Sequence, residues 1–87
     1  MDTKKDYIYT MVVFQTNPLN ATIPDLTLFI SADSRNELMN RATELATKEV
    51  QLLFKQGKTI PAPRSLDYLR SRWNQEGIEF LSVAVRL

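Results

Sequence analysis

Residues 56–69 have the sequence QGKTIPAPRSLDYL, and the order of glycine, proline and serine in this stretch decides the fold. Gly57 can adopt the left-handed conformation that ends a helix. Pro61 and Pro63 bias the residues before them to extended geometry and prevent a helix from continuing. Ser65 is a favourable N-cap for a new helix. The stretch therefore predicts a long helix, an extended connection and a second, shorter helix.

The helix that ends at Gly57 is predicted to begin at Ser34, the first residue of the capping box Ser-Arg-Asn-Glu. In such a box the serine hydroxyl accepts a hydrogen bond from a first-turn amide, and Glu37 reaches back to the amide of the cap residue. The apolar side chains of this helix form one broad arc, wider than a single contact with a sheet requires. We expect the second helix to cover the excess; the alternative is that a partner chain covers it.

Three strands are predicted before the long helix. Residues 6–16 (DYIYTMVVFQT) are rich in β-branched and aromatic residues and are apolar on both faces, which is typical of a central strand. A turn at 17–20 leads to a return strand at 21–23, which Pro24 ends, and a third strand follows at 27–31. Strands joined by such short turns are expected to form an antiparallel meander.

The second helix is expected from Leu66 to about Gln75, with Gly77 ending it, and residues 78–87 (IEFLSVAVRL) form a last strand. The predicted fold class is α+β: a two-layer βββααβ domain, mainly an antiparallel sheet, with one long and one short helix on one face. At 87 residues we expect a single domain that spans residues 1–87.

The amino-acid composition excludes several classes of function. Lys and Arg number 11 against 10 Asp and Glu, so the net charge of +1 gives no overall field that attracts nucleic acid or anionic lipid. The chain has no cysteine and no histidine, which removes thiolate and imidazole metal ligands, the thiolate nucleophile and the usual general base. We expect no cofactor and no metal. A cytoplasmic protein is expected, because no apolar stretch is long enough to cross a membrane.

Two groups of residues are candidates for a chemical or binding role. Asp25, Asp33 and Glu79 are candidate ligands of a nuclease Mg²⁺ ion, but their spacing matches no motif, so we expect no catalytic residues and no enzyme. A basic stretch with interleaved aromatic residues runs from Lys55 to Arg72 and suggests nucleic acid binding. Its members are Lys55, Lys58, Arg64, Arg70 and Arg72, with Tyr68 and Trp73 among them. We favour a solvated basic surface whose aromatic rings face the core.

The order of these motifs resembles the HicB-like antitoxin family. In that family a Phe-Pro-Asp-Leu segment precedes a capped helix rich in Glu, Ala and Leu, which ends in Gly, Ile-Pro-x-Pro-Ser and Leu. Here residues 23–26 (IPDL) take the first place, Ser34 is the cap, and residues 57–66 (GKTIPAPRSL) take the last. The similarity extends from about Tyr7 to Leu87.

The resemblance implies an antitoxin that binds and blocks a small HicA-like mRNA interferase toxin, which is itself built like a double-stranded-RNA-binding domain. It also implies self-association. For the toxin-binding surface we select the Pro-Asp-Leu turn and the extended connection. The residues are Pro24, Asp25, Leu26, Ile60 and Pro61.

The sequence departs from the family pattern in three places. Residues 27–29 (TLF) stand where Pro-Gly-Cys is usual, and Arg35 and Glu49 replace residues that are commonly apolar or aromatic. Many members continue into a DNA-binding module, whereas this sequence ends at Leu87 after the last strand, so operator binding is not expected. The alternatives are an orphan HicB-like domain without a toxin, or a small nucleic-acid-binding regulatory protein that uses the stretch from residue 55 to residue 72.

The last strand also bears on assembly. Residues 78–87 are apolar on both faces, and an exposed apolar edge strand invites pairing with a second copy. We therefore expect a homodimer. The alternative is a monomer in which this strand lies inside the sheet with both of its edges paired.

Overall fold

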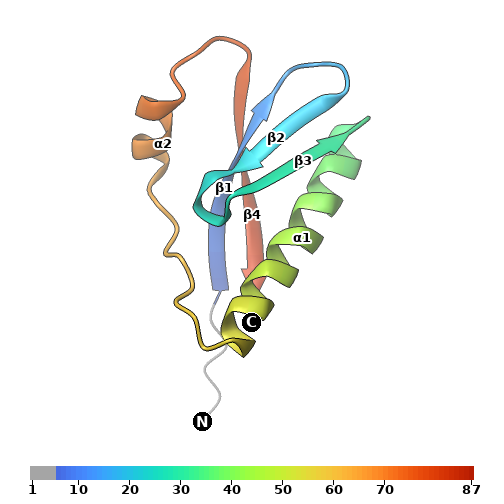
Figure 1. The fold of residues 1–87 in the computed structure, drawn as a ribbon. Helices are drawn as coiled ribbons and strands as arrows, with labels where there is room; N and C mark the ends of the chain where they lie inside the picture. Colours follow the sequence, from blue (N-terminus) through green and yellow to red (C-terminus); the bar gives the residue numbers. More distant parts are fainter. Residues whose placement is uncertain (1–5) are drawn as a thin grey trace.

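A computed structural model describes residues 6–87, and its elements follow the predicted order (Figure 1). The strands form one sheet in the order β3-β2-β1-β4, in which every neighbouring pair is antiparallel. The four strands are β1 (Asp6–Phe14), β2 (Leu19–Ile23), β3 (Leu28–Ala32) and β4 (Ile78–Arg86). The predicted α+β class with a mainly antiparallel sheet is confirmed.

β1 is the central strand, but its two edges are paired over different lengths. It pairs with β4 along its whole length and with β2 only at Val12, Val13 and Phe14. β2 ends at Ile23 because the next residue, Pro24, has no N–H to donate to a strand ladder. The first half of β1 therefore has a neighbouring strand on its β4 side alone within residues 6–87.

α1 (Arg35–Lys55) lies across one face of the sheet, and its ends follow the sequence closely. The Ser34 hydroxyl accepts a hydrogen bond from the Glu37 N–H at 3.2 Å. The Glu37 carboxylate accepts from the Asp33 N–H at 2.9 Å, and not from the cap residue as predicted, so the capping box closes one residue earlier. Gly57 has a φ of 68° and ends the helix as predicted.

The core lies between α1 and the sheet. Side chains alternate along β1, so Tyr9, Met11 and Val13 point toward the helix, and all three are fully buried. The α1 side chains that meet the sheet are spaced three or four residues apart along one stripe of the helix. They are Leu38, Ala42, Ala46 and Val50. The two alanines let the helix backbone approach the large side chains of the central strand.

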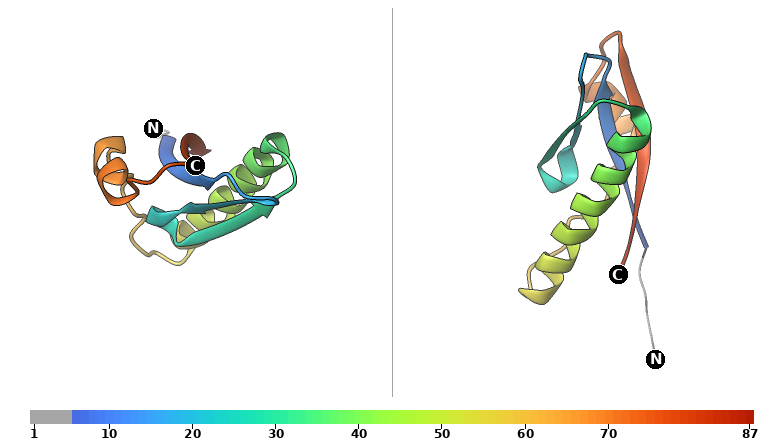
Figure 2. Two further views of the ribbon diagram at one scale, coloured as in Figure 1. Left: turned by 90° about the horizontal axis from the view of Figure 1, so that it is seen from above. Right: turned by 90° about the vertical axis from the view of Figure 1, so that its right-hand side faces the viewer.

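α2 (Leu66–Arg72) is shorter than predicted, and its position differs from the prediction in one respect. Its C-cap residue Trp73 packs edge-on against Phe14, with 5.5 Å between ring centroids. Phe14 points to the face opposite Tyr9, because the two residues are five apart on one strand. Figures 1 and 2 accordingly show the two helices on either side of the β1–β4 pair. The two helices therefore lie on different faces of the sheet, and not on one face as predicted. The connection between them passes the half of β1 that is not paired with β2, and so α2 reaches the other face.

This position of α2 also decides what happens to the broad apolar arc of α1. The prediction that the second helix covers the excess is wrong, because α2 lies on the other face of the sheet. Leu45, Leu52 and Phe54 remain exposed on α1, and Phe54 is 64% exposed. Part of the arc is therefore a solvent-facing apolar surface.

Candidate partner interface

Three of the predicted toxin-binding residues, Pro24, Asp25 and Leu26, lie between β2 and β3, and Ile60 and Pro61 lie in the connection between the helices. η1 (Pro24–Leu26) is a single 3-10 turn that starts at the proline, whose missing N–H suits the first position of a helix. Thr27 closes the turn with a φ of 55° and donates its N–H to the Pro24 carbonyl at 3.2 Å. Asp25 and Leu26 are both buried beneath this turn.

Asp25 joins the turn to the connection between the helices. Its side chain is only 2% exposed, and both carboxylate oxygens are used. Oδ2 accepts from the Arg64 N–H at 3.0 Å, and Oδ1 accepts from the Arg64 Nε at 2.5 Å. A buried carboxylate requires such partners, because an unpaired charge is costly away from water. This hydrogen bond also raises the pKa of Arg64.

A second hydrogen bond joins the same connection to the central strand. The Tyr9 hydroxyl donates to the Pro61 carbonyl at 2.7 Å, across 52 residues of sequence. Burial raises the pKa of Tyr9 to about 12, and the nearby ionisable groups of Tyr7 and Asp25 act in the same direction. The hydroxyl therefore stays protonated, and remains a donor, well into the alkaline range.

The structure links the connection to the turn through Arg64 and Asp25, and to the central strand through Pro61 and Tyr9. Sequence reasoning missed Arg64 and Tyr9 as partners. Arg64 was counted in the basic stretch, and Tyr9 only as a strand residue. A comparison of charges could have identified Arg64. It is the one cation in residues 60–65, and Asp25 is the one acid in residues 23–26. We call the joined residues 24–26 and 60–64 the clamp.

The basic stretch is partly used within the molecule. The Arg64 guanidinium lies 5.0 Å from the Tyr68 ring centroid and donates to the Tyr68 hydroxyl at 3.1 Å, in addition to its pairing with Asp25. Trp73 is partly buried against Phe14. The remaining cations are exposed and come from both helix ends and the connection. They are Lys55, Lys58, Arg70 and Arg72.

The three carboxylates that were candidate metal ligands do not point to a common site. Asp25 is paired with Arg64, Glu79 is paired with Arg35 and accepts from the Gln15 amide at 3.0 Å, and Asp33 is exposed after β3. Within residues 6–87 no three carboxylates form a group that could hold a metal ion.

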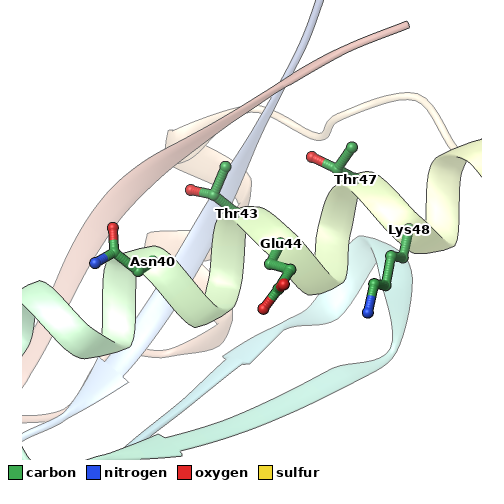
Figure 3. A pocket seen from close by; sticks show the side chains of 5 residues that line it. All are labelled: Asn40, Thr43, Glu44, Thr47 and Lys48. Carbon is green, nitrogen blue, oxygen red and sulfur yellow. The ribbon is translucent and has the colours of Figure 1, made fainter.

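An open hollow lies on the outer surface of α1. Asn40, Thr43, Glu44, Thr47 and Lys48 line it, and all five come from the same helix (Figure 3). A binding pocket usually combines groups from several elements in an enclosed space. We therefore regard the hollow as helix surface and not as a ligand site.

Within residues 6–87, no helix has the length and the apolar character that crossing a membrane requires. No family model matches the chain, and neither the curated proteins nor the solved structures contain a significant match.

Proposed function

We propose that this chain is a non-enzymatic binding module that acts as a HicB-like antitoxin and blocks a HicA-like mRNA interferase. One observation carries the proposal. The two segments on which the resemblance rests, residues 23–26 and 57–66, are far apart in the sequence but are joined in the clamp by Asp25 and Arg64. A motif whose separate parts form one rigid unit is what a preformed protein-binding surface requires.

The burial of the clamp residues suggests a division of roles. Asp25 and Leu26 are buried and hold the clamp together, while Pro24, Ile60 and Pro61 are partly exposed. Their neighbours Thr27, Ala62 and Pro63 are exposed. The toxin would then contact the exposed clamp residues and these neighbours, and Asp25 would act by positioning them.

The test is to search for a toxin gene beside the gene for this chain and to co-express the two. We expect the chain to restore growth and to co-purify with the toxin. Ala62→Glu places a charge on the exposed clamp surface and should abolish both effects. Gln51→Glu introduces the same charge at an exposed position of α1 and serves as the matched control. Absence of a neighbouring toxin gene, together with no rescue and no co-purification, would contradict the antitoxin proposal.

The alternative is an orphan domain or a regulatory protein that binds nucleic acid through the stretch from residue 55 to residue 72. Four exposed cations favour it, whereas the use of Arg64 and Trp73 inside the molecule counts against it. Phosphate contacts make affinity fall with salt, by a log–log slope of about −0.7 per contact for a single strand. A gel shift with single-stranded RNA at low salt decides the matter: binding lost on Lys58→Glu would support the alternative, and no shift would remove it.

A further inference from the structure

The outer edge of β4 is the longest free strand edge of the described chain. β4 pairs with β1 through all nine of its residues, and no strand within residues 6–87 lies on its other side. Its six central residues, 80–85, include no charge, no proline and no glycine. The other edge strand, β3, has only five residues. Natural proteins protect edges with charge, proline or short length, and β4 has none of these protections along its centre.

The flank of α1 beside this edge is also uncharged beyond the first helical residue, Arg35, which pairs with Glu79 of β4. Arg41 donates to the Ser31 carbonyl, which places one flank of the helix over β3. The opposite flank, on the β4 side, carries Thr43 and Thr47, and Figure 3 shows these two pointing away from Glu44 and Lys48. At 3.6 residues per turn, three more uncharged residues share this flank. They are Asn36, Asn40 and Phe54.

We infer that the chain forms a homodimer in which β4 pairs antiparallel with β4 of a second copy about a two-fold axis. The two sheets then join into one, with both α1 helices on the same side. This inference does not rest on the proposed antitoxin function. A second copy is favoured over another partner because an antiparallel β4–β4 pair sets the uncharged residues 80–84 of the two copies against each other and brings no like charges together.

The register follows from two conditions. Residues that lie opposite each other in the joined sheet must point to the same face, and pairing is greatest when all nine residues take part. Both conditions place Ser82, the midpoint of β4, on the axis. Phe80 then faces the small Ala84 of the second copy on the open face, and Leu81 faces Val83 of the second copy beneath the helices. Ser82 and Ala84 are exposed in the single chain, so the open face is free to accept this pairing.

Charges at the axis test the interface. Wild-type protein should sediment at twice the chain mass of 10.0 kDa at micromolar concentration. Ser82→Lys and Ser82→Glu each place like charges opposite one another and should weaken the dimer at least about tenfold. An equimolar mixture of the two variants should restore it, which also shows that both are folded. Ser31→Lys, an exposed serine on the β3 edge, is the matched control and should leave the dimer intact.

Cysteine cross-linking tests the register, because the chain has no cysteine of its own. Opposite residues of an antiparallel pair have Cα atoms about 4.5–5.5 Å apart, within disulfide range, so Ser82→Cys should cross-link on oxidation. Two copies of Ala84→Cys would lie four residues apart along the strands, about 13 Å, and should not. A monomer at all concentrations, or disruption by Ser31→Lys in place of the Ser82 variants, would overturn the dimer. Cross-linking of Ala84→Cys in preference to Ser82→Cys would overturn the register.

Discussion

The two faces of the sheet are built in different ways. On the α1 face a 21-residue helix covers buried residues from every strand, and Leu38 is one of its fully buried side chains. On the other face α2 has only 7 residues: Val12 is fully buried there, but Phe14 is only partly buried, and Ile8 and Phe29 remain 59% and 78% exposed. Stability therefore resides mainly on the α1 face, whereas the α2 face is held by a few specific contacts and leaves part of the sheet surface exposed.

The largest expected effect tests this contrast with one substitution made on each face. Leu38 and Leu69 are both almost completely buried, the first in α1 and the second in α2. Leu38→Ala should lower the free energy of unfolding by about 3–4 kcal/mol, because the surrounding core cannot collapse into the cavity. Leu69→Ala should cost about 2 kcal/mol, because the short helix can shift toward the cavity. Urea unfolding followed by circular dichroism measures both values.

Trp73 provides an independent measurement of the α2 face, because it is the only tryptophan in the sequence and lies at the end of α2. In Leu69→Ala its fluorescence should change at a lower urea concentration than the circular dichroism signal, since α2 leaves the sheet first. In Leu38→Ala the two transitions should coincide. Equal losses of stability in the two variants, with coincident transitions in both, would break the contrast between the faces.

An intermediate effect is expected at alkaline pH. The pKa of Tyr9 is raised from 10.0 to about 12 in the folded chain, so folding favours the protonated hydroxyl. The resulting stability is fully present below pH 10 and is lost as the pH rises to about 12, by an amount on the order of 2 kcal/mol. Tyr9→Phe is the control: it should cost about 1 kcal/mol at pH 7, because the Pro61 carbonyl loses its donor.

The measurement is the difference in unfolding free energy between wild type and Tyr9→Phe from pH 8 to pH 12. Subtraction cancels the titration of the other tyrosines and of the lysines. The difference should shrink and then change sign as Tyr9 ionises. A constant difference across this range would contradict the raised pKa of Tyr9, and no loss of stability in Tyr9→Phe at pH 7 would contradict the hydrogen bond to Pro61.

The smallest expected effects concern the two helix caps. The Ser34 and Ser65 hydroxyls each accept from an N–H three residues later, at 3.2 Å in both cases. Ser34→Ala should cost about 1 kcal/mol of global stability, since α1 is part of the core. Ser65→Ala should cost about 0.5 kcal/mol and act mainly on Trp73 fluorescence. Aspartate at either position preserves the cap and should recover most of the loss; failure of aspartate to do so would argue against capping as the cause.

The sequence predicted those features that depend on neighbouring residues. Ser34, Gly57 and Ser65 each set a helix end through contacts within a few residues, and all three were identified. The antiparallel meander of the first three strands followed from short turns, and the central place of residues 6–16 from their apolar character. These are local rules, so one sequence is sufficient to apply them.

What the sequence did not predict depends on contacts across long separations. The bond between Asp25 and Arg64 spans 39 residues, and no local pattern links these two side chains. The face of the sheet on which α2 lies depends on the early end of β2. Because β2 pairs with only the last part of β1, the connection between the helices can pass along the unpaired half of β1. The burial of the five predicted site residues divides them into a buried pair, Asp25 and Leu26, and a partly exposed group, and periodicity alone does not reveal that division.

The pairing of β1 with β4 also determines when the sheet can be completed during synthesis. The last residue of β1 and the first residue of β4 are 64 positions apart, Phe14 and Ile78. At translation rates of 5–20 residues per second, β1 therefore waits roughly 3–13 s for its longest partner strand. During that interval the apolar central strand of the nascent chain has an open edge, and chaperones or neighbouring nascent chains have access to it before β4 closes it.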